Sequence, residues 1–422
     1  MSNYLETGKF AFFHLDLERQ APSNPELIKG IRKELGNNVL TIPLVADEFQ
    51  KRLADSTLLA GIHPDNRSYG GVIVEAVTPS LGRNYADAWN VLETVASPKT
   101  GLKGEIITIF TMFEGRDSNP KKHFGGVTAL EQYIRDVRTH SYQKISVYAV
   151  WDVHDVITLN KLKNVNGRKN IPEVISITAM PLFTDRLQED GLIDDETFVA
   201  APDFGSITKA RQMAQVLGKE LIFIKKTRPE PNRVEIEGVY LIKKDGSVEK
   251  KNYDFLKGIR VIFFDDMMDT GRTAIEDTSA VKAAGAREVV FCATHPVFSS
   301  PEILLHALDE RILDYIYTTD SLPNYKKIVD PLNPQVLHPR LRLQSLAKPI
   351  AALIKMAADK ATDEDYQLVK RCLYNPGPEK KVIEYQFTKG NIAPAFEGYN
   401  FYDGITGKLK SGIIYIADLK EK

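Results

Sequence analysis

Two adjacent aspartates, Asp265 and Asp266, directly follow an apolar run in the segment VIFFDDMMDTGRT. Asp269 and the polar stretch Thr270–Thr273 come next, ahead of a helical pattern that begins near Ala274. The free backbone N–H groups and the dipole of a helix N-terminus favour a bound anion such as phosphate. Carboxylates beside a phosphate would repel it unless they accept hydrogen bonds from sugar hydroxyls or hold a cation. The segment therefore indicates a site for a phosphorylated sugar; the alternative is a capped turn whose aspartates face water.

The elements that must position these residues follow an alternating pattern, which predicts an α/β fold with mainly parallel sheets. Apolar runs rich in Val, Ile and Phe predict buried strands, and they span residues 71–77, 105–113, 145–153, 197–203, 221–226, 260–266 and 288–294. Helical periodicity spans residues 24–35, 86–96, 129–139, 207–217 and 274–284. Gly218 and Gly285 are predicted to cap the last two helices. The segment around Asp245-Gly246 alternates like a β-hairpin.

Changes in composition along the chain predict three parts. A polar connection rich in Asn and Lys, residues 160–170, separates a first α/β series from a second. After Ala358 the pattern changes to YNPGPEKK followed by short strand-like runs. We therefore predict an N-terminal α/β domain over residues 1–170, a C-terminal α/β domain over residues 171–358 and a small β-rich extension over residues 359–422.

The composition excludes several classes of protein. The 422 residues include 55 basic and 56 acidic side chains, so no overall field attracts nucleic acid or an anionic membrane. Cys292 and Cys372 lie far apart and outside any CxxC pattern, which argues against a disulfide scaffold or a zinc ribbon. The N-terminal residues lack a basic segment followed by an apolar core, and no long apolar run occurs. We expect a cytoplasmic protein with no nucleic-acid or membrane partner.

The segment around Asp265 resembles the 5-phosphoribosyl-1-pyrophosphate (PRPP) binding motif of the type I phosphoribosyltransferase fold. Residues 178–236, from TAMPLFTDR to NRVEI, resemble the ribose-phosphate diphosphokinase (PRPP synthetase) family over their whole length, as do ATHPVFSS and IYTTDSLP. Weaker matches are WDVHD, MFEGRD, RLADST and SNPELIKGIRKELG. The resemblance covers nearly all of residues 20–358. It implies two domains of phosphoribosyltransferase type, followed by an extension that has no counterpart in the family.

The resemblance implies a substrate-binding role for each matching loop. One group of residues would bind the ribose phosphate: Asp265, Asp266, Asp269, Thr270, Gly271, Arg272 and Thr273. A second group would bind ATP or its transferred diphosphate: Asp55, Arg116, Asp117, Gly205 and Ser206. For the turn that holds Gly205 and Ser206, an ordinary tight turn is the alternative.

The catalytic and metal-binding residues are also implied by the resemblance. His154 and Asp203 each follow a predicted strand, where ligands gather at the carboxyl edge of an α/β sheet. They would bind Mg²⁺ with the nucleotide phosphates, and His154 would also be catalytic; a histidine at a strand end is otherwise often structural. Lys226 and Arg228 match two cations that close over the family's active site and neutralise the transferred phosphates. We predict a polar loop containing Pro229 at this point, and a solvated basic turn is the alternative.

The implied activity is transfer of the β,γ-diphosphate of Mg-ATP to the 1-hydroxyl of ribose 5-phosphate, giving PRPP and AMP. The implied partners are these two small molecules and further copies of the chain, in a dimer or a larger homo-oligomer. The inserted segments and the extension argue against the family's usual hexamer.

The sequence departs from the family in the loops that would bind nucleotide and phosphate. Residues 113–117 read FEGRD where the family has Tyr-Ala-Arg-Gln-Asp, and Thr57 replaces a glutamate. The phosphate loop reads DTGRT, so Arg272 stands where the family has a glycine, and an arginine suits a larger or doubly charged group. A phage-encoded branch of the family transfers a diphosphate to ADP-ribose in a pathway that rebuilds NAD, and this acceptor is one alternative. A non-catalytic regulator and a phosphoribosyltransferase that consumes PRPP are the others.

Overall fold

The computed structural model describes residues 10–15, 24–46, 58–60, 70–77, 95, 106–113, 145–152, 173–202, 206–230, 233–243, 247–372, 395–402 and 409–415. The chain divides into two compact units. The first comprises Met1–Ala179, Thr319–Pro323 and Ser345–Tyr374, and the second comprises Met180–Thr318, Asn324–Gln344 and Asn375–Lys422. Within the described ranges, no helix is long and apolar enough to cross a membrane.

The first unit is built on a seven-stranded sheet with the order β3-β2-β1-β4-β5-β6-β7. Neighbouring strands are parallel except for the antiparallel pair β2–β3. The strands are β1 (Phe10–Leu15), β2 (Thr41–Ala46), β3 (Leu58–Ala60), β4 (Gly70–Val77), β5 (Ile106–Phe113), β6 (Ile145–Trp151) and β7 (Glu173–Ile177). The helices that the structure describes here are α1 (Pro25–Leu35), α10 (Ala347–Ala357) and α11 (Asp363–Cys372).

Helix α1 begins where the sequence predicts, because Asn24 caps its N-terminus. The Asn24 side chain accepts a hydrogen bond from the Leu27 N–H, and Pro25 occupies the first turn, where its missing N–H costs nothing. Helix α1 lies against α10 at a close approach: a Cβ added to Gly30 would lie 2.8 Å from Ala347 Cβ. Contacts between segments far apart in sequence therefore tie residues beyond 345 to the first unit.

The second unit is built on an eight-stranded sheet with the order β11-β10-β9-β8-β12-β13-β14-β17. The central run from β9 to β14 is parallel, and β10 and β11 extend it in antiparallel orientation. The strands are β8 (Thr197–Ala201), β9 (Leu221–Glu230), β10 (Arg233–Ile242), β11 (Val248–Lys251), β12 (Arg260–Met268), β13 (Glu288–Pro296), β14 (Tyr315–Thr319) and β17 (Leu341–Gln344). These two sheets confirm the predicted α/β fold with mainly parallel strands.

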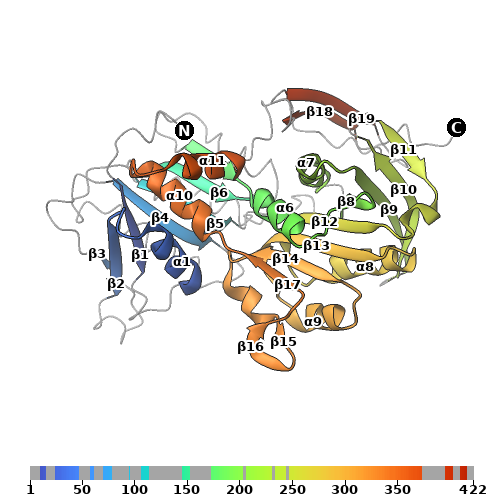
Figure 1. The fold of residues 1–422 in the computed structure, drawn as a ribbon, viewed down its shortest axis with the longest axis horizontal. Coiled ribbons are helices and arrows are strands. Elements are labelled where there is room, and N and C mark those ends of the chain that lie inside the picture. The colour runs from blue at the N-terminus through green and yellow to red at the C-terminus, as the bar shows by residue number, and fades with distance from the viewer. Residues whose placement is uncertain are drawn as a thin grey trace, which may run out of the picture. The chain divides into compact units, whose positions relative to one another are not determined.

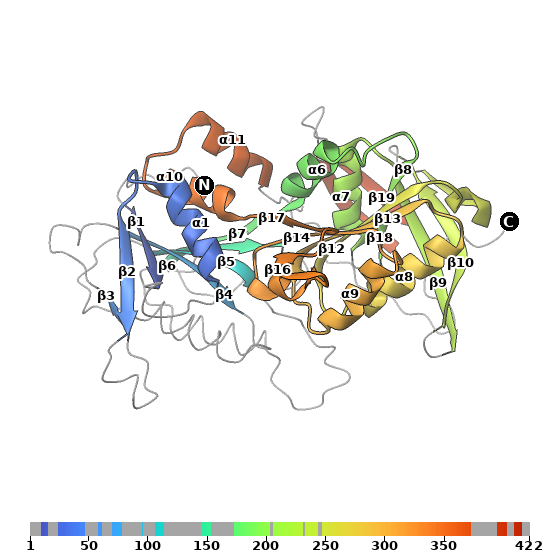
Figure 2. The same ribbon diagram turned by 60° about the horizontal axis from the view of Figure 1, so that its bottom comes forward.

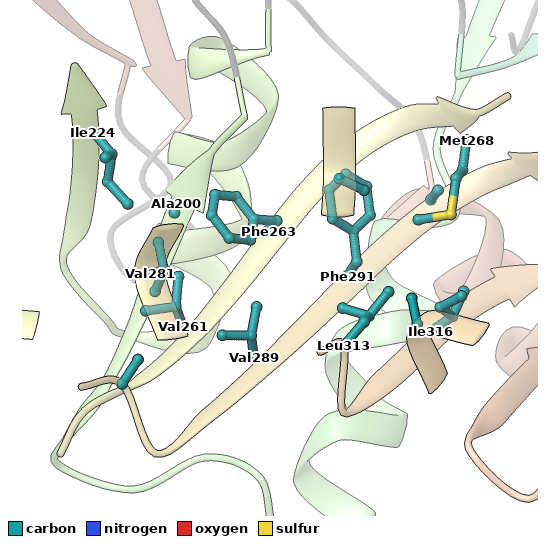
Figure 3. Packing of buried hydrophobic residues seen from close by; sticks show 14 of the residues in the cluster. Ala200, Ile224, Val261, Phe263, Met268, Val281, Val289, Phe291, Leu313 and Ile316 are labelled. Carbon is teal, nitrogen blue, oxygen red and sulfur yellow. The ribbon is translucent and has the colours of Figure 1, made fainter. Parts of the chain in front are cut away.

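Helices cover both faces of the second sheet (Figures 1 and 2). Helices α6 (Met180–Glu189) and α7 (Ile207–Leu217) lie on one face, and α8 (Arg272–Ala283) and α9 (Pro301–Asp309) lie on the other. Between the sheet and α8 and α9, a buried apolar cluster is formed by alternate strand residues such as Val261, Phe263 and Phe291 (Figure 3). Phe264 points to the opposite face, where its ring centroid lies 6.1 Å from that of Phe183 on α6.

The remaining elements are short. They are the 3-10 helices η4 (Tyr253–Leu256) and η5 (Pro323–Lys327) and the strands β15 (Val329–Asp330), β16 (Asn333–Leu337), β18 (Ala395–Tyr402) and β19 (Leu409–Tyr415). Strands β15 and β16 form one antiparallel pair, and β18 and β19 form another. The predicted helices at 86–96 and 129–139 lie outside the described residues, apart from Val95.

The structure differs from the sequence-based expectation in two places. The two units do not follow the predicted boundaries, because α10 packs on α1 and brings α11 with it; the predicted extension over 359–422 therefore begins with a helix of the first unit. The predicted loop after Lys226 is wrong, since β9 remains a strand through Pro229 to Glu230. Beyond Phe223, β10 is the only partner of β9 among the residues that the structure describes, and the register shifts there, so a residue without an N–H is tolerated.

Candidate functional site

The parallel strands of the second unit create a switch point between β8 and β12. Strand β8 connects through α7 to β9 on one side, whereas β12 connects through α8 to β13 on the other side. In open α/β sheets, ligands bind beyond the carboxyl ends of the strands at such a point. The loop after β8 and the loop after β12 flank it, and these loops contain Ser206 and the predicted ribose-phosphate residues.

Gly271 shapes the loop between β12 and α8. It is the N-cap of α8 and has a φ angle of 76°, a conformation that favours glycine. A Cβ added at this position would lie 2.1 Å from Leu304 Cδ2 on α9. Only a glycine allows the chain to turn here while α9 packs against the turn, so Gly271 brings the N-terminus of α8 to the end of β12.

The phosphate-loop residues around Gly271 present their side chains to solvent. Asp269, Arg272 and Thr273 are exposed, and Thr270 is half-buried. The Arg272 N–H donates to Thr270 Oγ1 over 3.3 Å, which stabilises the turn locally. An exposed arginine and two threonines at a helix N-terminus form an arrangement that can bind a phosphate.

The two adjacent aspartates have different surroundings. Asp265 is half-buried, and its Oδ1 accepts a hydrogen bond from the Asp266 N–H at 2.9 Å. Asp266 is only 2% exposed. Its side chain follows the parity of Phe264, toward the face covered by α6 and α7, and its Oδ1 lies 3.2 Å from Lys209 Nζ. Of the two carboxylates, Asp265 is the more accessible to a ligand.

Lys209 was not among the residues that the sequence analysis selected. It is the third residue of α7 and only 8% exposed, and it forms its ion pair across to β12. The sequence contained one indication of its role. A lysine in the first turn of a helix lies near the free N–H groups and the positive end of the helix dipole, which is unfavourable without a nearby anion. Its partner was not predictable, since the pair joins residues that are far apart in the chain.

The loop after β8 is described only in part. Ser206 is buried and is the N-cap of α7, while the predicted ligands Asp203 and Gly205 lie outside the described residues. The structure therefore brings Ser206, Lys209 and Asp266 to one edge of the sheet.

The backbone of Lys226 and Arg228 belongs to β9, the strand next to β8, but their side chains lie outside the described part. His295 is buried near the end of β13 and is 2% exposed.

In the first unit, β6 ends at Trp151, and Asp152 follows with a φ angle of 36°. Asp152 is buried, and its Oδ2 accepts a hydrogen bond from the Ala179 N–H at 2.8 Å, which holds this strand end. The predicted residues of this unit are His154, Asp55, Arg116 and Asp117, and all four lie outside the described residues.

A metal site is not formed by the described residues alone. Among them, no cluster of three or more His, Cys, Asp or Glu side chains could hold a metal ion. The predicted magnesium ligands, His154 and Asp203, are outside this set. Imidazole and carboxylate are suitable ligands for a divalent cation, and the predicted pair stays a prediction.

Comparison with known proteins supports the α/β fold and the family predicted from the sequence. The model of the phosphoribosyl transferase domain family matches residues 180–330, which include the β8 and β12 connections. A ribose-phosphate pyrophosphokinase from Caldanaerobacter subterraneus is 34% identical over 310 residues, covering 72% of this chain and 86% of that protein. One from Aquifex aeolicus is 31% identical over 288 residues, covering 67% and 81%. The chain belongs to the ribose-phosphate pyrophosphokinase family, as the sequence motifs predicted.

Other matches are shorter. A ribose-phosphate pyrophosphokinase from Thermotoga maritima is 32% identical over 177 residues, covering 40% of this chain and 51% of that protein. The chain spans only about half the length of this relative and of two similar ones.

A solved structure resembles the fold over most of the chain. The crystal structure of phosphoribosylpyrophosphate synthetase from Mycobacterium smegmatis has a TM-score of 0.61 at 20% identity, covering 84% of this chain and all of that one. This likeness concerns the fold.

Proposed function

We propose that the protein is a diphosphotransferase that converts ATP and ribose 5-phosphate into PRPP and AMP. The observation that carries the proposal is the loop after β12, where Gly271 at a φ angle of 76° places an acidic strand end beside a helix N-terminus. This loop lies at the switch point of a sheet in a chain of the ribose-phosphate pyrophosphokinase family. A phosphorylated ribose matches both its anion-binding and its hydroxyl-binding groups.

In the proposed reaction, the anomeric 1-hydroxyl oxygen attacks the β-phosphorus of ATP. The bond between that phosphorus and the oxygen bridging to the α-phosphorus breaks, AMP leaves with the electron pair, and the hydroxyl proton is released. Asp265 and Asp266 accept hydrogen bonds from ribose hydroxyls, with Asp269 beside them, and Thr270–Thr273 bind the 5-phosphate. Positioning of this kind supplies much of the rate enhancement in phosphoryl transfer.

The residues proposed to bind the diphosphate donor, ATP, come from other segments of the chain. Gly205 and Ser206 bind the transferred diphosphate at the N-terminus of α7, and Lys226 with Arg228 neutralises charge that builds up on it. The family resemblance assigns the ATP side to Asp55, Arg116 and Asp117 and the magnesium to His154 and Asp203. Magnesium bound with ATP would supply charge neutralisation on the phosphates.

The test is a product assay on the purified chain. With ATP, Mg²⁺ and ribose 5-phosphate, we expect equal amounts of AMP and PRPP, measured by ion-pair chromatography with mass detection. Replacing Asp265 with Asn should raise the KM for ribose 5-phosphate more than the KM for ATP. If ATP is consumed without a nucleobase and AMP forms, a phosphoribosyltransferase that consumes PRPP is excluded. Absence of AMP with every acceptor would favour the non-catalytic regulator.

Arg272 favours a second candidate acceptor, ADP-ribose. Arg272 is exposed in the first turn of α8, where a glycine would give bare backbone. A guanidinium offers a fork of donors that suits the two phosphates of a diphosphate. The same assay with ADP-ribose in place of ribose 5-phosphate separates the candidates, since the higher kcat/KM identifies the preferred acceptor. No AMP formation with ADP-ribose would remove this candidate and leave the first intact.

A further inference from the structure

The ion pair between Lys209 and Asp266 links the two loops that flank the switch point. Lys209 lies in the first turn of α7, shortly after the proposed diphosphate-binding residues, and Asp266 lies near the end of β12, three residues before the proposed phosphate-binding stretch begins at Asp269. Their charged atoms, Lys209 Nζ and Asp266 Oδ1, are 3.2 Å apart. Figure 1 shows α7 against the sheet that contains β8 and β12. One interaction therefore joins the donor and acceptor sides of the site.

This pair is more deeply buried than others in the same unit. The side chains of Lys209 and Asp266 are 10% and 3% exposed, against 44% and 43% for Lys225 and Glu237. Burying two charges costs desolvation energy that their attraction seldom exceeds by much, so a buried pair is weak evidence for added stability. A charged pair buried this deeply beside the proposed ribose-binding residues is better explained by an effect on substrate binding than by an effect on stability.

The charge balance of the loop suggests that role. Asp265 and Asp266 are adjacent carboxylates, and the proposed substrate is itself an anion. Two adjacent carboxylates repel each other and an anionic substrate. Lys209 places a positive charge 3.2 Å from Asp266, the more buried of the two, and offsets part of this repulsion.

We infer that Lys209 is a positioning residue that fixes the carboxylate of Asp266 for the ribose hydroxyls. The inference rests on the proposed function and extends it, because it gives Asp265 and Asp266 different roles in ribose binding. Asp265 binds the ribose from an accessible position, whereas Asp266 binds it from a position that α7 controls. Lys209 acts through Asp266 and does not touch the substrate.

The experiment compares Lys209→Met, Asp266→Asn and the double variant with the wild type. Met keeps the length of the side chain and removes the charge. We expect Lys209→Met to raise the KM for ribose 5-phosphate about tenfold, with a smaller change in the KM for ATP, as is typical when a group that orients a ligand-binding residue is lost. In the Asp266→Asn background, Lys209→Met should add little, because its target is gone.

Two further variants control for folding. Lys282→Met removes the lysine of the Lys282–Asp314 pair, which is 2.5 Å long and lies at the other end of α8; it should leave both KM values unchanged. Lys209→Arg retains the charge and should recover part of the lost affinity. If Lys209→Met fails to fold, as circular dichroism would show, the neutral double variant and Lys209→Arg still report on the coupling.

Calorimetric binding of ribose 5-phosphate, measured without ATP, separates this inference from the proposed reaction. A wild type that binds ribose 5-phosphate without forming AMP would refute the reaction, and a weaker binding constant in Lys209→Met would still support the inference. Equal losses from Lys209→Met in the wild-type and Asp266→Asn backgrounds would overturn it, since Lys209 would then act on the substrate directly. An unchanged ribose 5-phosphate affinity in Lys209→Met, or no binding by the wild type, would also overturn it.

Discussion

The two strand-to-helix connections at the switch point of the second sheet differ in how they are encoded. The connection from β12 to α8 has its proposed ligand residues within one contiguous stretch, Asp265–Thr273, and Gly271 sets its geometry. The connection from β8 to α7 contributes Ser206 and Lys209 and relies on Lys226 and Arg228 from the next strand. We call them the acceptor connection and the donor connection, after their proposed substrates.

The two connections also differ in how far they depend on other segments of the chain. The acceptor connection is largely a local structure, in which a strand, a turn with positive φ and a helix N-terminus follow one another, with Lys209 on α7 as a distant partner of Asp266. The proposed donor connection draws on a further segment of the second unit, since Lys226 and Arg228 belong to β9. Substitutions at Lys226 and Arg228 should therefore act on turnover, and those in the acceptor connection on acceptor binding. Lys209 belongs with the acceptor connection in this respect, because it acts through Asp266.

The largest expected effect tests the donor connection. Lys226→Ala should lower kcat on the order of a hundredfold to a thousandfold, because it removes a preorganised cation from charge that builds up in the transition state. The KM for ribose 5-phosphate should change little. Steady-state rates of AMP formation measure both values. A rise in that KM with kcat preserved would break the division between the two connections.

The next effect tests the geometry of the acceptor connection. Gly271→Ala places a methyl group 2.1 Å from Leu304 Cδ2 at a φ angle of 76°, so the free energy of unfolding should fall by about 2–4 kcal/mol. The control is Gly191→Ala, where φ is 68° and no heavy atom lies within 4 Å of the added carbon. That variant should lose only about 1 kcal/mol. Urea denaturation measures both, and equal losses would show that Leu304 moves aside freely.

The difference between the acceptor and donor connections also explains which parts of the fold can be predicted from the sequence. The order of strand, turn and helix in the acceptor connection was predicted to within two residues of the observed bounds, because strand periodicity, turn chemistry and helix start coincide within VIFFDDMMDTGRT. The binding roles of its residues stay a prediction. The strand and helix pattern also predicted the α/β class, and helix α7 was predicted at its observed bounds, Ile207–Leu217. These features depend on interactions between residues close in the chain.

What could not be predicted depends on contacts between distant segments. The ion pair between Lys209 and Asp266 requires α7 to lie on the face of β12 to which even-numbered residues point. The continuation of β9 through Pro229 depends on β10 as its partner. The packing of α10 on α1 required Gly30 to meet Ala347, residues more than three hundred positions apart. No local pattern in the sequence reports such pairings.

A smaller effect sharpens the specificity of the acceptor connection. Arg272→Gly restores the glycine that the family motif has, and Arg272 is exposed, so the fold should be unaffected. If Arg272 binds the second phosphate of ADP-ribose, the kcat/KM for ADP-ribose should fall about tenfold, which is the usual loss for one charge-assisted hydrogen bond. The kcat/KM for ribose 5-phosphate should fall less, because Thr270, Gly271 and Thr273 still bind the 5-phosphate in this variant. Equal losses for both acceptors would instead assign Arg272 to the 5-phosphate that they share.

The smallest effect should come from Lys225, the neighbour of Lys226 in β9. The Lys225 side chain pairs with Glu237 across the β9–β10 hairpin, and both side chains are exposed by more than two fifths, at 44% and 43%. An exposed pair of this kind contributes about 0.2–1 kcal/mol to stability. Lys225→Met should therefore lower the free energy of unfolding by less than about 1 kcal/mol and leave kcat unchanged, which makes it a matched control for Lys226→Ala. A large loss of turnover in Lys225→Met would mean that turnover depends on the total positive charge of β9 and not on the position of Lys226 alone.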